Sequence, residues 1–161
     1  MTDNDDDLRD LYQDLILDHG KRPRNFHAIE HAHCEAVGHN PLCGDKLVLF
    51  LTVGPEGRIA DASFQGEGCA ISVASASMMT EMLKGKTAAE AKALWAYFEA
   101  LCKGNAIEEA DKAALDEDDV ARLQALAGVR HYPVRVKCAT LAWRTLESAL
   151  DPAAVKKVGT E

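Results

Sequence analysis

The chain has 161 residues, of which 26 are acidic and 18 are basic, so its net charge is −8, and 47% of it is hydrophobic. This length and composition predict a single domain over residues 1–161 with a core of its own. The acidic balance argues against binding to nucleic acid or to an anionic membrane surface. No apolar run approaches the roughly 18 residues of a membrane span. Residues 1–7 are acidic where a secretion signal would be basic. We therefore expect a cytoplasmic protein with a disordered acidic N-terminus over residues 1–7.

The first half of the chain predicts a helix, a hairpin and a second helix. Apolar residues at helical spacing predict the first helix over 7–19. Residues 34–37 are a candidate strand. The β-rich runs 46–53 and 58–65 flank a Gly-Pro-Glu-Gly turn, which predicts the hairpin. The density of Ala, Ser and Met in 69–83 predicts a buried helix that packs closely on the sheet.

The second half of the chain is helical by its pattern. Thr87, followed three residues later by Glu90, predicts an N-cap and a capping box. The segment 103–119 is polar and acidic, a short helix is expected over 120–127, and a final helix is expected over about 135–150. Strands followed by a run of helices favour an α+β fold, with a small antiparallel sheet of about three strands packed against helices.

Three cysteines and one aspartate form a candidate metal site. The chain has five cysteines, and in a reducing compartment metal binding or thiol chemistry is favoured over disulfides. Cys43 and Asp45 are expected in a loop before the first long strand, where Gly44 lets the chain turn. Cys69 is expected where a strand passes into a helix, and Cys138 in the first turn of the final helix. Three thiolates and a carboxylate suit Zn²⁺, and thiolates also suit an iron–sulfur cluster. Spacing alone leaves open the alternative of buried structural cysteines.

Other candidate residues carry weaker signals. The segment 30–34 (Glu-His-Ala-His-Cys) has the composition of a second metal site, but surface histidines are the favoured interpretation. His39 and His131 are candidates to line the main site. Cys34 and Cys102 are expected to be inert structural thiols.

The motifs that surround these ligands resemble one known family. They are Asn40-Pro41-Leu42-Cys43-Gly44-Asp45, residues 66–72 (Gly-Glu-Gly-Cys-Ala-Ile-Ser), residues 137–143 (Lys-Cys-Ala-Thr-Leu-Ala-Trp) and parts of residues 11–25. Together they resemble the U-type (NifU/IscU/SufU) iron–sulfur cluster assembly proteins over roughly residues 8–150. The polar insertion at about 103–128, and Lys137 where the scaffold branch has a histidine, make the chain most similar to the SufU branch.

The resemblance implies a SufE/NifU-like α+β fold and a zinc ion held by Cys43, Asp45, Cys69 and Cys138. It implies a zinc-dependent sulfurtransferase that accepts persulfide sulfur from a SufS-type, PLP-dependent cysteine desulfurase and relays it to a downstream cluster scaffold. Two alternatives stay open, namely a scaffold that binds a nascent [2Fe–2S] cluster on the same ligands and a zinc-stabilised adaptor without chemistry.

Within the implied relay, sulfur moves by attack of a thiolate on a persulfide. Cys43 is the expected acceptor, because it lies in a glycine-containing loop while Cys69 and Cys138 are expected on helix starts. Arg135 and Lys137 are expected to support the site, either by stabilising negative charge on Cys138 or by meeting the partner.

Overall fold

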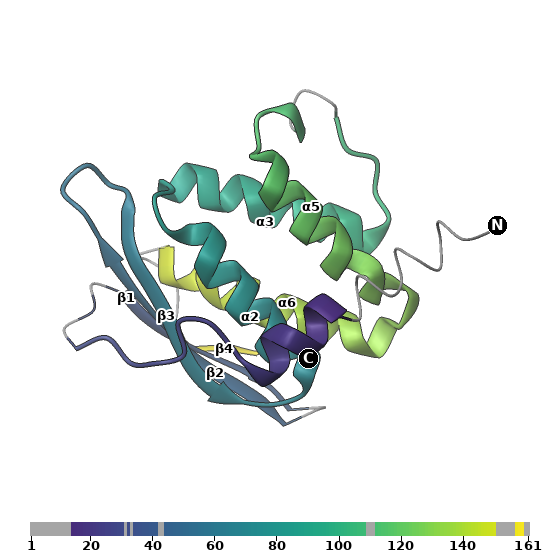
Figure 1. Cartoon of the computed structure of the whole chain (residues 1–161), viewed down its shortest axis with the longest axis horizontal. Coiled ribbons are helices and arrows are strands. Elements are labelled where there is room, and N and C mark those ends of the chain that lie inside the picture. The colour runs from purple at the N-terminus through teal and green to yellow at the C-terminus, as the bar shows by residue number, and fades with distance from the viewer. Residues whose placement is uncertain are drawn as a thin grey trace.

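A sheet with helices gathered on one side of it forms the core of this protein (Figure 1). The structure is a computed structural model, and it describes residues 14–30, 32, 34–41, 44–108, 112–150 and 157–159. The acidic segment 1–7 therefore lies outside the described residues, as do residues 7–13 of the helix expected over 7–19. Residues 14–21 are helical, in agreement with that expectation.

The sheet has the strand order β3-β2-β1-β4. The strands are β1 Cys34–Asn40, β2 Asp45–Val53, β3 Ile59–Glu67 and β4 Lys157–Gly159. β1, β2 and β3 pair antiparallel in chain order, which confirms the predicted three-stranded antiparallel sheet and the α+β class. The short β4 pairs parallel to β1 and was not predicted.

β1 and β2 are paired up to their adjoining ends. Asn40, the last residue of β1, pairs directly with Asp45, the first residue of β2. The expectation that Asp45 lies in the loop is therefore wrong, because β2 begins at Asp45 itself. Side chains alternate along β2, so that Asp45, Leu47 and Leu49 are buried on the inner face.

Two helices follow the sheet largely as predicted. α2 spans Ala70–Leu83, with Cys69 as its N-cap residue. α3 spans Ala88–Lys103 and has the predicted capping box, in which Thr87 accepts from the backbone of Glu90 and the Glu90 side chain accepts from the backbone of Thr87. This reciprocal pair satisfies N–H groups that a helix start otherwise leaves without partners.

The last helices begin earlier than predicted. α5 spans Glu117–Leu126, because the Asp116 side chain caps it and the acidic residues of its first turn favour a helix N-terminus. The acidic run was interpreted as a polar loop, so the predicted start at residue 120 is too late. A 3₁₀ turn, Ala127–His131, follows α5 directly. α6 spans Pro133–Leu150, since the fixed φ of proline suits the first position of a helix.

α6 and α2 form the layer that packs directly on the sheet. α6 contacts β1, α2 contacts β3, and the two helices contact each other. The hydroxyl of Ser75 on α2 donates to the carbonyl of Ala139 on α6 over 2.5 Å. α3 and α5 pack on the far side of this layer (Figure 1), where the indole of Trp143 lies against Trp95 and Phe98. No helix within the described ranges has the length and apolar character needed to span a membrane.

Candidate metal centre

Three of the four predicted ligands meet at one end of the sheet. One carboxylate oxygen of Asp45 and the sulfur atoms of Cys69 and Cys138 all lie within 4.8 Å of one another. They come from the start of β2, the N-cap of α2 and the body of α6. Asp45 and Cys138 are fully buried and Cys69 is half-buried. The fold therefore brings together side chains that are far apart in the sequence.

The carboxylate of Asp45 is fixed by the chain that leads into α2. Its Oδ1 accepts a hydrogen bond from the backbone N–H of Cys69 over 2.8 Å, and its Oδ2 lies 4.0 Å from the Cys69 sulfur. Gly68 makes this approach possible, because a Cβ at that position would lie 2.3 Å from Oδ1. Asp45 is thus oriented by a backbone N–H at the start of α2.

Cys69 sits where the sequence placed it. It is the N-cap residue of α2, with extended backbone dihedrals, and its side chain makes no capping hydrogen bond. The start of α2 therefore presents the Cys69 sulfur to the centre, and the first turn of the helix contains no acidic residue.

Cys138 is placed differently from the prediction. Because α6 begins at Pro133, Cys138 lies in its second turn and not in its first, beyond the range over which a helix N-terminus acts strongly. Among the described residues, Asn40 and Val134 contact its sulfur. The side-chain amide of Asn40 donates to it over 3.9 Å, and the thiol lies 4.0 Å from the carbonyl oxygen of Val134.

The other candidate residues are not among the three that meet at the centre. Cys43 lies outside the described residues, and so do His31 and His33. His39 and His131 are described but are not part of the group formed by Asp45, Cys69 and Cys138. Both histidines are exposed.

The two basic candidates are on α6, just before Cys138. Arg135 is exposed, and its backbone N–H donates to the carbonyl of Tyr132 over 2.7 Å. Lys137 is half-buried. Arg135 is three residues from Cys138, so the two share one side of the helix, whereas Lys137 is adjacent to Cys138 in sequence and faces another side.

The three donors fit a metal ion. In a tetrahedral zinc site, bonds of about 2.0–2.3 Å place the ligand atoms roughly 3.5–4 Å apart. The ligand atoms of Asp45, Cys69 and Cys138 lie within 4.8 Å of one another, so each has to move by about 1 Å or less to reach that separation. Two thiols with one carboxylate in a buried site suit zinc or an iron–sulfur cluster better than magnesium or calcium, which prefer oxygen ligands.

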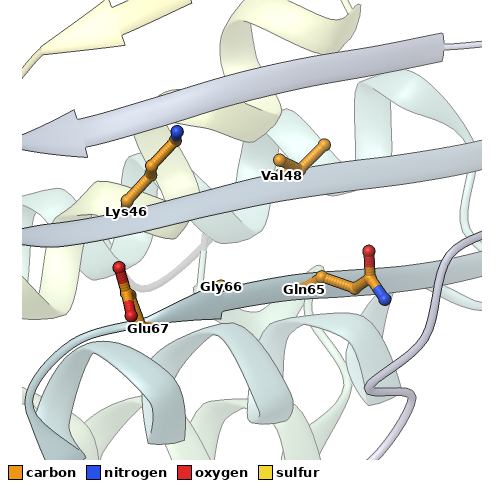
Figure 2. Close-up of a pocket in the computed structure, with 5 residues that line it drawn as sticks. All are labelled: Lys46, Val48, Gln65, Gly66 and Glu67. Atoms are coloured by element: carbon orange, nitrogen blue, oxygen red, sulfur yellow. The ribbon is translucent and has the colours of Figure 1, made fainter.

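The opposite face of the sheet carries a shallow groove (Figure 2). Its lining residues are Lys46, Val48, Gln65, Gly66 and Glu67. Lys46 and Val48 alternate with Asp45 and Leu47 along β2, so the groove opens on the outer face while the candidate ligands lie on the inner face. The groove is therefore not part of the metal centre.

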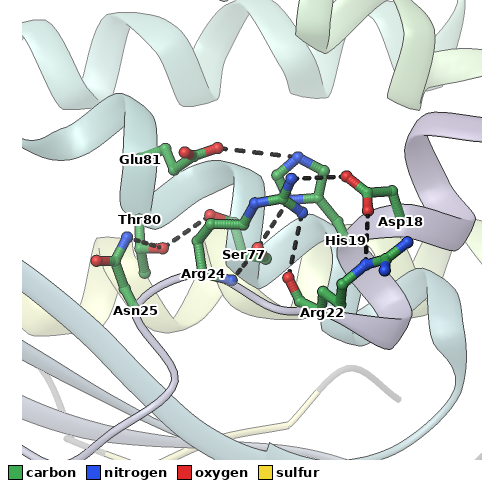
Figure 3. A network of polar contacts seen from close by, with 8 residues as sticks. All are labelled: Asp18, His19, Arg22, Arg24, Asn25, Ser77, Thr80 and Glu81. Atoms are coloured by element: carbon green, nitrogen blue, oxygen red, sulfur yellow. Dashed lines mark hydrogen bonds and ion pairs between the residues drawn. The ribbon is translucent and has the colours of Figure 1, made fainter.

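A polar network that the sequence did not reveal ties the N-terminal segment to α2 (Figure 3). The buried ring of His19 contacts the hydroxyl of Ser77 through Nδ1 over 2.7 Å, and its Nε2 lies 3.8 Å from Glu81. Ser77 also accepts from the backbone N–H of Arg24, whose guanidinium pairs with Asp18 over 2.6 Å. Burial lowers the pKa of His19, and the nearby Arg24 lowers it further. His19 is thus held neutral at the helix whose start carries Cys69.

The remaining cysteines differ from the ligand set. Cys102 is buried in α3, and burial raises the pKa of its thiol to about 11. Cys34 is half-buried at the start of β1. Neither belongs to the candidate centre.

Comparison with known proteins gives matches along most of the chain. The family model of the NifU-like N-terminal domain matches residues 11–139. The zinc-dependent sulfurtransferase SufU of Bacillus subtilis (strain 168) is 39% identical over 143 residues, which cover 89% of this chain and 91% of SufU. The iron–sulfur cluster assembly scaffold protein IscU of Streptococcus pyogenes serotype M1 is also 39% identical, over 148 residues that cover 91% of this chain and 87% of IscU.

Solved structures of the same family have the same fold as this chain. The crystal structure of FiSufU from Fervidobacterium islandicum AW-1 matches with a TM-score of 0.75 and 36% identity, covering 85% of this chain and 94% of FiSufU. A NifU-like N-terminal domain from Brucella abortus has the same TM-score at 22% identity, which shows the shared fold. The resemblance drawn from the cysteine motifs is therefore confirmed. This chain belongs to the NifU-like N-terminal domain family, the iron–sulfur cluster assembly family that includes SufU and IscU.

Proposed function

We propose that this chain is a zinc-dependent sulfurtransferase, which accepts persulfide sulfur from a SufS-type cysteine desulfurase and relays it toward iron–sulfur cluster assembly. The observation that supports this most directly is the convergence of Asp45, Cys69 and Cys138 within 4.8 Å. The similarity to the zinc-dependent sulfurtransferase of Bacillus subtilis, over nine tenths of that protein, points to the same chemistry.

The metal would be held by Asp45, Cys69, Cys138 and Cys43. Cys43 precedes Asp45 by two residues, so chain connectivity alone keeps their Cα atoms within about 7 Å. When bound, zinc keeps its cysteine ligands deprotonated at neutral pH. Asp45 supplies a hard oxygen donor among soft sulfurs, and the N–H of Cys69 orients it.

Cys43 is the proposed sulfur acceptor. Its thiolate attacks the outer sulfur of the donor persulfide, so that a new S–S bond forms on Cys43. The S–S bond of the donor breaks, and its electron pair leaves on the donor cysteine as a thiolate. Cys69 is held at a helix start and Cys138 is buried within a helix, whereas Cys43 belongs to the short connection between β1 and β2. Because helices fix the positions of Cys69 and Cys138, Cys43 is the ligand that we propose as the acceptor.

Arg135 and Lys137 are proposed to support the transfer. Both lie within one turn of Cys138, and both are at least partly accessible, so they can meet the acidic or persulfide-bearing loop of a partner. The downstream acceptor is proposed to be a cluster scaffold.

A second candidate function is a scaffold for a nascent [2Fe–2S] cluster on the same ligands. The similarity to the scaffold protein IscU of Streptococcus pyogenes, at the same identity, favours it. Metal analysis separates the two. Protein purified without added metal is expected to carry tightly held zinc in a 1:1 ratio and no visible cluster absorbance. A cluster that forms and persists on reconstitution, with no zinc retained, would instead support the scaffold.

The relay itself is tested by turnover of a SufS-type desulfurase with and without this protein. The wild type is expected to stimulate turnover and to gain one sulfur in mass on Cys43. The Cys43→Ser variant is expected to lose both effects, while Cys34→Ser, at a cysteine outside the centre, keeps them. The proposal fails if Cys43→Ser still accepts sulfur and still stimulates the desulfurase.

A further inference from the structure

Asn40 lies at the edge of the candidate centre with its side chain enclosed. It is the last residue of β1 and is fully buried. Its cross-strand partner is Asp45, so the two side chains lie next to each other on the inner face of the sheet. The amide nitrogen Nδ2 of Asn40 donates to the sulfur of Cys138 over 3.9 Å. A buried amide and a buried thiol thus meet beside the proposed ligands.

The close packing of α6 on β1 creates this contact. Gly38 is two residues before Asn40, and a Cβ there would lie 2.1 Å from the hydroxyl of Thr145 and 3.1 Å from Leu141. The missing side chain therefore lets α6 lie directly on the strand. Asn40 shares the inner face with Gly38, so its amide comes within reach of Cys138, which lies one turn before Leu141 on α6.

We propose that Asn40 is a positioning residue of the metal centre, whose side-chain amide donates a hydrogen bond to Sγ of Cys138 and holds that sulfur as a fixed metal ligand. The inference rests on the proposed function, because it requires the centre to bind a metal.

The physical reason is the burial of Cys138. A fully buried thiolate has no water to donate hydrogen bonds to it, so a donor from the protein lowers the cost of its charge. A hydrogen-bond donor that contacts a ligand side chain, but not the metal itself, orients that ligand and strengthens metal binding. A hydrogen bond to sulfur also withdraws electron density from it, which makes Cys138 less nucleophilic. Asn40 therefore helps Cys138 to hold the metal and leaves sulfur transfer to Cys43.

The test uses the full-length Asn40→Leu variant, because leucine has nearly the shape of asparagine and no donor. Its zinc affinity is measured by competition with a chromophoric chelator, and its Co²⁺ form is compared with wild type by the sulfur-to-cobalt charge-transfer band. We expect zinc binding about 10- to 100-fold weaker and a shifted charge-transfer band. The matched control is Asn105→Leu, at an exposed asparagine beyond the end of α3, and it is expected to behave as wild type.

A role limited to filling space predicts a different result. In that case Asn40→Leu would keep both the zinc affinity and the cobalt spectrum of the wild type, and this outcome would overturn the inference while leaving the proposed function intact. If the leucine variant does not fold, as judged by thermal unfolding of the apo form, Asn40→Ala, which also lacks a donor, is measured in its place with the same expectation. Absence of zinc binding by the wild type itself would overturn the proposed function, and the inference with it.

Discussion

The backbone N–H of Cys69 donates a hydrogen bond of 2.8 Å to Oδ1 of Asp45. This bond joins the first residue of β2 to the N-cap residue of α2, so two proposed ligands are oriented toward each other by the fold itself. Gly68 lies directly beside the bond. The geometry of the centre therefore depends on a residue that carries no ligand atom.

Gly68→Ala is expected to damage the centre. The new Cβ would lie 2.3 Å from Oδ1 of Asp45, so the carboxylate must move and its hydrogen bond from Cys69 is lost. We expect zinc affinity to fall at least about tenfold, and the free energy of unfolding of the apo protein to fall by roughly 1.5–3 kcal/mol.

Chelator competition and urea unfolding measure these two effects. Gly54→Ala is the control, since a Cβ there would meet its nearest heavy atom at 3.4 Å, an ordinary contact distance. Wild-type zinc affinity in Gly68→Ala would show that Asp45 tolerates the displacement and is not held as described.

Lys86→Met is expected to destabilise the attachment of α5. Lys86 lies between α2 and α3, and its Nζ is 2.9 Å from Oδ2 of Asp119 on α5, with side-chain exposures of 22% and 6%. Removal of the cation leaves a buried carboxylate without its partner charge. The free energy of unfolding is expected to fall by about 3 kcal/mol. This is the lower end of the range for loss of one partner of a buried ion pair, because Lys86 keeps some contact with water.

Lys84→Met provides a matched comparison, because Lys84 pairs with Asp61 on the surface, with exposures of 43% and 44%. Its loss should cost about 1 kcal/mol or less. In urea unfolding, the double variant Lys86→Met, Asp119→Leu should recover much of the stability. Equal effects of the two lysine substitutions would contradict the burial argument.

The stability of the fold is expected to decrease in mild acid because of His19. Burial lowers the pKa of this histidine from its ordinary value of 6.5, and Arg24 adds to the effect, while Glu81 and Asp18 oppose it. Below pH 6.5 the unfolded chain therefore binds a proton that the folded chain does not. The contribution of His19 is fully present above that pH and is lost as the pH falls toward the folded pKa.

Urea unfolding at about pH 5.5 and about pH 7.5 measures this dependence. His19→Asn keeps an acceptor near the position of Nδ1 and removes the titration, so the difference in stability between the two pH values should shrink. His27→Asn, at an exposed histidine, should leave the difference unchanged. A variant at position 19 with the full acid dependence of the wild type would exclude His19 as its source.

Cys102 is expected to resist alkylation in the folded protein. With its pKa raised to about 11 by burial, only about 0.1% of this thiol is ionised near pH 8, and the thiolate is the reactive form. Mass-spectrometric mapping after brief iodoacetamide treatment should find Cys102 unlabelled in the folded state and fully labelled in urea. Equal labelling in both states would mean that α3 opens readily.

Local structure was largely determined by the sequence itself. The capping box at Thr87 and Glu90, the hairpin after residue 45 and the buried helix after Cys69 all depend on residues a few positions apart. Their signals are periodicity, caps and turns, which neighbours along the chain decide. The early starts of α5 and α6 were missed, because Asp116 and Pro133 act as start signals within segments whose composition is typical of loops.

The tertiary structure decided the architecture of the centre. The cysteine motifs identified Asp45, Cys69 and Cys138 as candidates, but their meeting depends on how closely α6 packs on β1 and how Gly68 passes Asp45. The same holds for the contact of Asn40 with Cys138 and for the pairing of Lys86 with Asp119. Such contacts join residues far apart along the chain, so no local period or spacing encodes them. They follow from the packing of complementary surfaces, in which the absence of a side chain at Gly38 and Gly68 matters as much as the ligands themselves.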